Sequence, residues 1–286
     1  MAILGGWNPF WAIIAAGVIG AILSIPTAYV VFRLKGAYFA VGTWVAAEVY
    51  RLAFAQWTAL GGGTGTSMPS DVARSVFGLE WVREVFDVRS SAARDIVSYW
   101  IALFIVVVLV GAIYAFLRTR SGLALSAIRD SETGAASVGV DIERAKFAVY
   151  MFAAFGAAVT GGLIFFNDAS ITPSSAFSLI DWTAFVLFIV VIGGIGTLEG
   201  PFVGALILFF LQKWFAQYGA GYLIGLGALA IIVMLAAPQG IWGFIRQKYD
   251  FSIFPTRRRL LGPAEPVPDY TQPTKQMTLP QSSIGE

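Results

Sequence analysis

Long apolar runs are the feature that most limits what this chain can fold into. The runs from Trp11 to Phe32 and from Tyr99 to Leu117 reach the ~20 residues that a helix needs to cross ~30 Å of hydrocarbon. In lipid the backbone polar groups of such a run must bond to one another, and a helix achieves this. Only 13% of the 286 residues are charged, about half the share in soluble domains. We therefore predict an all-α integral membrane protein.

About seven segments are expected to cross the membrane as helices. They are Trp11 to Phe32, Tyr38 to Gln56, Tyr99 to Leu117, Phe147 to Phe166, Trp182 to Gly196, Pro201 to Trp214 and Tyr222 to Ala237. The fifth and sixth are short and flank a glycine-rich joint. We interpret this joint either as a tight turn between two spans or as a break in irregular helices.

The basic residues predict the orientation, because lysine and arginine are enriched on the cytoplasmic side. If residues 118–146 are inside, thirteen of the nineteen basic residues lie on that side. The same choice places six tryptophans near the outer interface, which indole rings prefer: Trp7, Trp11, Trp57, Trp100, Trp182 and Trp214. We predict a multi-pass transmembrane domain over residues 1–244. Residues 245–286, rich in proline and polar residues, are predicted to form a disordered cytoplasmic tail.

The absence of cysteine and histidine excludes whole classes of function. Without them the chain has no disulfide, thiol nucleophile, histidine-based triad, or thiolate or imidazole metal site. It also lacks the G-x-x-x-x-G-K-[ST] loop that holds ATP phosphates. The small net charge of +2, with no basic stripe, argues against nucleic-acid binding. We predict that the chain is not an enzyme and carries no metal or cofactor of its own.

The segment from Ser121 to Val140 is the most informative part outside the apolar runs. It is moderately polar, compatible with a helix, and lies between two predicted spans. Ser121 is placed to cap its start, and Gly139 to close its end in a left-handed conformation. Small and ionic side chains would meet another protein there: Ala135, Ala136, Arg129, Asp130 and Glu132. Composition alone leaves two interpretations open, a helix that docks on a separate ATPase and an ordinary connecting loop.

Two groups of residues within the spans have both a functional and a structural interpretation. Glu48 and Arg51 are three residues apart, so on a helix they share a face and pair. They either line or gate a pathway, or form a structural pair near the helix end with Arg51 reaching the interface. The glycines of the joint serve either close helix packing or a hinge: Gly193, Gly194 and Gly196.

Other residues are candidates for contact with a solute. The loops Gly61 to Ser67 and Thr172 to Ser178 offer hydroxyls and backbone amides to a docked protein or a solute, or are plain exposed turns. Four phenylalanines suit an aliphatic solute, or face lipid and pack: Phe165, Phe166, Phe185 and Phe188.

Several stretches resemble segments of permease subunits from branched-chain amino acid (Liv-type) ABC importers, in the same order along the chain. They are RLKGAYFAVGTWVAAEVYRLAFAQWTALGGGTG from Arg33, GLALSAIRDSETGAASVGVDIERAKFAVY from Gly122, and VVIGGIGTLEGPFVGA from Val190. The stretch ASITPSSAFS from Ala169 is similar to a further outer loop of that family. Together they extend from about Arg33 to Gly240.

The resemblance implies an assembly in a bacterial inner membrane. A second permease subunit, two ATP-binding cassette subunits and an extracytoplasmic solute-binding protein would surround the chain, with ATP and Mg held by the cassettes. The coupling segment 118–146 would contact them, with Ala135, Ala136 and Gly139 matching the family's Glu-Ala-Ala loop and Glu132 displaced from its usual glutamate. The implied solutes are branched-chain or related neutral amino acids, and the alternative solutes are urea or short amides.

Two further expectations concern the N-terminus and the energy source. The helices that such permeases carry before this point have no counterpart here, so we expect N-terminal spans to be missing from this sequence. An ion-coupled secondary transporter or channel, a different class of protein, predicts a buried acidic relay and inverted repeats. We find Glu48 alone among acidic residues well inside a predicted span, which argues against proton coupling.

Overall fold

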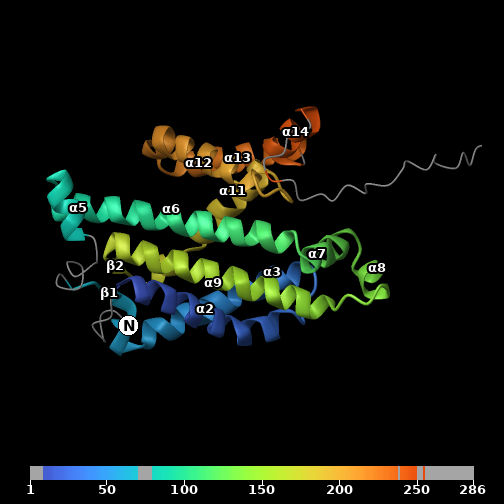
Figure 1. Ribbon diagram of the computed structural model, residues 1–286, viewed down its shortest axis with the longest axis horizontal. Helices are drawn as coiled ribbons and strands as arrows, with labels where there is room; N and C mark the ends of the chain where they lie inside the picture. The colour runs from blue at the N-terminus through green and yellow to red at the C-terminus, as the bar shows by residue number, and fades with distance from the viewer. Residues whose placement is uncertain (1–8, 70–78, 238, 250–253, 255–286) are drawn as a thin grey trace, which may run out of the picture. The chain divides into compact units, whose positions relative to one another are not determined.

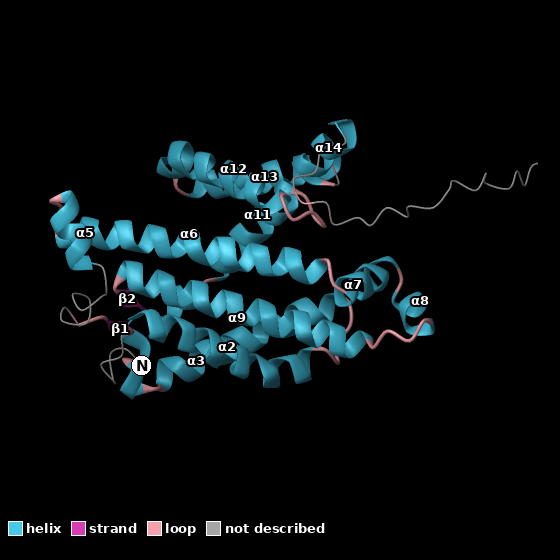
Figure 2. Ribbon diagram, in the orientation of Figure 1, coloured by secondary structure: helices cyan, strands magenta, loops and turns pink. Residues whose placement is uncertain are grey.

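The protein is built almost entirely from helices. The computed structural model describes residues 9–69, 79–237, 239–249 and 254. Figure 2 shows helices throughout this part of the chain, with a single pair of short strands. Five stretches of it are long and apolar enough to cross a membrane: Phe10–Val31, Ser90–Leu117, Ile142–Asp168, Pro173–Gly193 and Gly221–Tyr249. The predicted fold class is confirmed.

One group of helices is formed by α2 (Pro9–Val31), α3 (Ala37–Gln56), α6 (Ser90–Leu117) and α9 (Ile142–Asp168). In Figure 1, α9 runs between α2 and α6 and contacts both of them. Helices α2 and α9 are antiparallel. Just after α2 ends, the ring of Phe32 packs edge-on against Tyr150, near the start of α9, with 5.4 Å between ring centroids.

Small residues let α2 and α9 approach closely. A Cβ atom at Gly20 of α2 would overlap the Cβ of Ala158 on α9, so glycine is required for this spacing. The core of the group draws on α2, α5 (Leu79–Phe86), α6 and α9. Its buried members are Ile13, Leu79, Val82, Ala93, Val97, Val159, Leu163 and Phe166.

The second group consists of α11 (Phe185–Gly193), α12 (Gly200–Phe215), α13 (Ala220–Ala236) and α14 (Gly240–Tyr249). Helix α11 packs against the other three, and most closely against α12. Its smaller core contains Phe188, Ile192, Leu208 and Leu226. The side chains on the outside of α12 and α13 are largely apolar, as expected for helices that face lipid or another membrane subunit; they include Leu206, Phe209, Ile224, Ile231 and Leu235.

Short elements connect the helices at the end where α2 begins. They are η1 (Thr58–Leu60), η2 (Gly62–Thr64), β1 (Thr66–Ser67), β2 (Ser170–Ile171), α10 (Pro173–Ala176) and η3 (Leu179–Ala184). In the second group, η4 (Ala216–Tyr218) connects α12 to α13. Strands β1 and β2 are antiparallel, with Thr66 opposite Ile171. This pairing joins two loops that are far apart in the sequence.

All seven predicted spans are helical, but several boundaries differ. Helix α6 begins at Ser90 rather than Tyr99, because Ala93 and Val97 are buried in the core formed with α5. Residues 179–184 add a π-helical turn before α11. Two of the predicted spans, α3 and α12, are not among the five stretches that are long and apolar enough to cross a membrane. Helix α3 carries Glu48 and Arg51, and α12 has 16 residues. Helix α14 continues past the predicted boundary at residue 244, and apart from Phe254 the chain after it lies outside the described residues.

Most of the described basic residues of the first helix group lie at one end, whereas Arg51, Arg83, Arg89 and Arg94 lie towards the other. Helix α2 ends, α6 ends and α9 begins at the first of these ends, which also holds α7 (Arg120–Asp130) and α8 (Glu132–Ser137), as Figure 1 shows. It carries Arg33, Lys35, Arg118, Arg120, Arg129, Arg144 and Lys146. We call it the basic end. Trp11 on α2, Trp182 on η3, and Trp57 between α3 and η1 are at the opposite end, and Trp7 lies outside the described residues.

We expect Gly204→Ala to destabilise the contact between α11 and α12. A Cβ at this position would overlap the backbone carbonyl of Ile189, so the helices must separate at a cost of about 1–3 kcal/mol. Gly225→Ala is the matched control, since a Cβ there meets nothing within 4 Å and alanine favours helix. Thermal unfolding in detergent should show a lower midpoint for the first variant only. Equal midpoints would contradict this close packing.

Candidate functional site

The segment between α6 and α9 forms two helices rather than the predicted single one. Helix α7 ends at Asp130, and Ser131 adopts an extended backbone with φ of −161°. The Ser131 hydroxyl then accepts a 3.1 Å hydrogen bond from the backbone N–H of Gly134 and caps α8. Serine side chains compete with helical hydrogen bonding in this way, which is why the chain bends here.

The predicted ends of the segment are partly correct. Thr119, not Ser121, occupies the N-cap position of α7, and Ser121 lies inside the helix, so that prediction is wrong. Gly139 does adopt the predicted left-handed conformation, with φ of +84°. Its N–H donates to the carbonyl of Ala136 at 3.0 Å and closes α8.

The ionic residues predicted to contact an ATPase make contacts within the chain. Arg129 and Asp130 form an exposed pair at 3.2 Å. Glu132 binds the ammonium of Lys146 on α9 at 2.7 Å. This second pair ties α8 to the first turns of α9.

The apolar residues of the segment divide into buried and exposed ones. Ala135 is 2% exposed and packs within the chain, whereas Ala136 faces outward. Two larger side chains that sequence reasoning missed are exposed, Leu123 at 55% and Val138 at 76%. The segment lies outside the five described stretches that are long and apolar enough to cross a membrane, so these side chains are not part of a candidate span. We define the α7–α8 surface as Leu123, Arg129, Asp130, Ala136, Val138 and Gly139.

The predicted pairing of Glu48 and Arg51 on α3 is confirmed. The guanidinium donates to both carboxylate oxygens, with 2.9 Å between Nε and Oε2 and 2.5 Å between Nη2 and Oε1. A two-point contact of this kind is among the stronger ionic hydrogen bonds. The carboxylate of Glu48 is therefore engaged with Arg51.

The glycine joint forms a turn between α11 and α12. Gly194 and Gly196 have φ angles of +132° and +83°, which L side chains rarely adopt. Gly193 packs so closely on Gly200 that a Cβ would overlap the Gly200 carbonyl. The structure therefore agrees with the turn and the close-packing interpretations of these residues.

A buried glutamate in this turn was missed by sequence reasoning. Glu199 is 3% exposed, and its Oε1 accepts a 2.8 Å hydrogen bond from the backbone N–H of Phe254. The ring centroid of Phe254 lies 5.4 Å from the ring centroid of Tyr114, which is near the end of α6. These contacts place the α11–α12 turn at the basic end.

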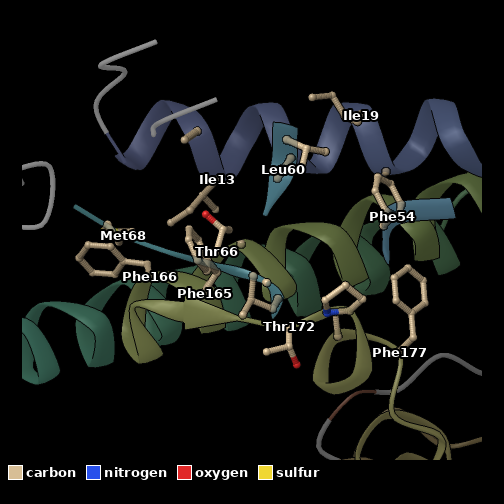
Figure 3. Close-up of a pocket in the computed structure, with 18 of the residues that line it drawn as sticks. Ile13, Ile19, Phe54, Leu60, Thr66, Met68, Phe165, Phe166, Thr172 and Phe177 are labelled. Atoms are coloured by element: carbon tan, nitrogen blue, oxygen red, sulfur yellow. The ribbon is translucent and has the colours of Figure 1, made fainter. Parts of the chain in front are cut away.

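An apolar cavity of about 500 Å³ lies at the opposite end. Figure 3 shows side chains from α2, α3 and α9 and from the strand pair around it. Phe165 and Phe166, two of the predicted solute-contact candidates, are in its lining, with Phe54 and Phe177 on other walls. Both predicted outer loops contribute as well, through Thr66 and Thr172. Periodicity did not indicate the cavity, because its walls come from segments distant in sequence.

Comparison with known proteins identifies the family. The family described as "Branched-chain amino acid transport system / permease component" matches residues 1–238, and the chain belongs to it. Two relatives named as the high-affinity branched-chain amino acid transport system permease protein LivM, from Salmonella typhimurium and Escherichia coli, are each 28% identical over 249 residues. The match covers 81% of this chain and 57% of each relative, so the chain spans little more than half of their length.

A third relative comes from an archaeon. The probable branched-chain amino acid transport permease protein LivH of Methanocaldococcus jannaschii is 29% identical over 154 residues, or 50% of this chain and 48% of the relative. No solved structure gives a significant match. The protein is thus a multi-pass membrane protein of a transport permease family.

We expect Ser131→Ala to loosen the start of α8. Loss of the cap should cost about 1 kcal/mol, so amides in the first turn of α8 should exchange with solvent several-fold faster in mass spectrometry. Ser121→Ala is the control, because Ser121 does not occupy a cap position. Equal exchange in both variants would show that Ser131 does not cap α8.

We also expect Glu48 and Arg51 to be energetically coupled. Glu48→Gln or Arg51→Gln alone leaves one ion without its partner and should lower the melting temperature. The melting temperature of the double variant should fall by less than half of the sum of the two single decreases, because the double variant removes both ions. Simple additivity of the melting temperatures would rule out a stabilising pair.

Proposed function

We propose that this chain is the transmembrane permease subunit of an ATP-driven ABC importer for branched-chain or related neutral amino acids. The observation that carries the proposal is the family match over residues 1–238. The absence of a phosphate-binding loop in the sequence supports hydrolysis of ATP, with its Mg, in a separate cassette subunit. The names of the relatives do not favour urea or short amides as solutes, or ion coupling as the energy source. The pairing of Glu48 with Arg51 also argues against a role for Glu48 in proton coupling.

In this proposal the basic end faces the cytoplasm of a bacterial cell, as the distribution of lysine and arginine favours. Arg246 and Lys248 in the last turn of α14 would put the C-terminus on the same side. The cavity end would then face outward, towards a solute-binding protein. A second permease subunit would pair with the chain, which is supported by relatives named both LivM and LivH.

The α7–α8 surface is proposed as the contact with the cassettes. It is polar at Arg129 and Asp130, apolar at Leu123 and Val138, and attached to α9 through the bond between Lys146 and Glu132. ATP binding would move the cassettes, and the segment would pass this movement to α9. The work comes from the different affinity of ATP for the inward-facing and outward-facing states. The pathway roles of Glu48, Arg51 and the glycine joint remain part of this proposal.

Uptake of labelled leucine by vesicles tests the proposal. The vesicles hold the full chain with its cassettes, partner permease and binding protein. We expect ATP-dependent uptake that falls at least tenfold in Arg129→Glu and in Gly139→Leu, with membrane insertion unchanged. The charge-matched control is Lys213→Glu, in the last turn of α12 and away from the α7–α8 surface.

Two outcomes would overturn the proposal. Uptake that persists without any cassette subunit would exclude ATP coupling and favour a secondary transporter. Competition by urea but not by unlabelled isoleucine or valine would reject the proposed solute class.

A further inference from the structure

The cavity at the end opposite the α7–α8 surface has a composition that limits what can fill it. The described residues that line it include no ionisable side chain, and most of the lining is aliphatic or aromatic. Its volume of about 500 Å³ corresponds to about 17 water molecules at ~30 Å³ each, and water is held in a cavity only where it finds several polar partners. An empty space would leave the lining without packing contacts. An apolar occupant fits better than water or a void.

The transported solute is a poor match for this space. The hydroxyl of Thr172, among the few polar groups of the lining, already accepts a bond from the N–H of Ser175 at 3.2 Å. The ammonium and carboxylate of an amino acid would therefore lose hydration without gaining ionic partners, which is costly. The side chain of leucine alone would also leave most of the volume unfilled. The size and apolar lining of the cavity suit a longer hydrocarbon chain.

The cavity is continuous with the apolar outer surface of α2. At its base Ile13 and Phe166 are 6% and 2% exposed, whereas Ile19, Leu23 and Leu60 in the lining are 38–39% exposed. Next to them on α2, Val18 and Ile22 are 49% and 57% exposed. Because α2 is a membrane span, its exposed apolar side chains face hydrocarbon or a membrane partner. A hydrocarbon chain from the bilayer can thus reach the base without passing a charged group.

We propose that the acyl chain of a membrane phospholipid occupies this cavity, between α2 and α9 on one side and α3 and α10 on the other. The lipid fills the space between these walls and becomes part of the packing at this end of the protein. The site requires insertion in the membrane, and it requires neither ATP nor a particular solute. It can therefore be tested separately from the transport function proposed above.

Photolabelling tests the site. The full chain is placed in vesicles that contain phosphatidylethanolamine with a diazirine near the end of one acyl chain, and is then irradiated and digested. We expect adducts on the peptides that contain Phe165 and Phe177. Labelling of the exposed residues Ile232 and Leu235 of α13 serves as an internal reference for surrounding lipid.

Two variants that fill the cavity, and one neighbour, complete the experiment. Gly162 lines the cavity, and a Cβ there makes only ordinary contacts of 3.4–3.5 Å with Ile13 and Ala16. Gly162→Leu, and Ala176→Leu on the opposite wall, should reduce cavity adducts at least fivefold. Gly161→Leu, one residue away with nothing within 4 Å of its Cβ, should leave them unchanged. Unchanged reference labelling on α13 shows that each variant is inserted in the bilayer, and an unchanged melting temperature shows that it is folded.

Two results would overturn the inference. Cavity adducts that persist at wild-type levels in both filled variants would show that the label reports surrounding lipid only. Adducts that an excess of leucine removes from the wild-type protein would assign the cavity to the solute instead of a lipid.

Discussion

The antiparallel contact between α2 and α9 is the interaction on which the rest of the structure depends. Glycine at position 20 lets the two helices approach until Ala158 fills the gap, and the ring of Phe32 meets Tyr150 where the pair ends. In a membrane such helices gain little from the hydrophobic effect, so close van der Waals contact must hold them together. Every other element of the first group is placed by its relation to this pair.

Helix α9 connects the two candidate sites. In its first turns, Lys146 forms an ion pair with Glu132 of α8. In its last turns, Phe165 and Phe166 line the cavity. A helix of 27 residues spans about 40 Å, so one rigid element reaches from the α7–α8 surface to the opposite end. The bond from Phe254 to Glu199 gives the second group its own contact with the basic end.

Much of the architecture was predictable from the sequence, because apolar runs have one stable form in lipid. The seven helical segments, the pairing of Glu48 with Arg51 and the left-handed Gly139 follow from local chemistry. The early start of α6 did not, because Ala93 and Val97 become buried only when α5 folds over them. The break at Ser131 was not predicted either. A serine is compatible both with a continuous helix and with a cap, and the anchoring of the segment in the folded chain determines which of the two forms.

Local sequence by itself determined that the chain is helical, inserted in a membrane and unequal in charge at its two ends. Spacing, composition and backbone chemistry are properties of neighbouring residues, and they suffice for these conclusions. Only the tertiary structure decided that β1 pairs with β2, that Glu199 is buried, that Ala135 turns inward, and that phenylalanines from separate helices enclose one cavity. Each of these results brings together residues distant along the chain, and the free energy of such contacts exists only after the helices have packed.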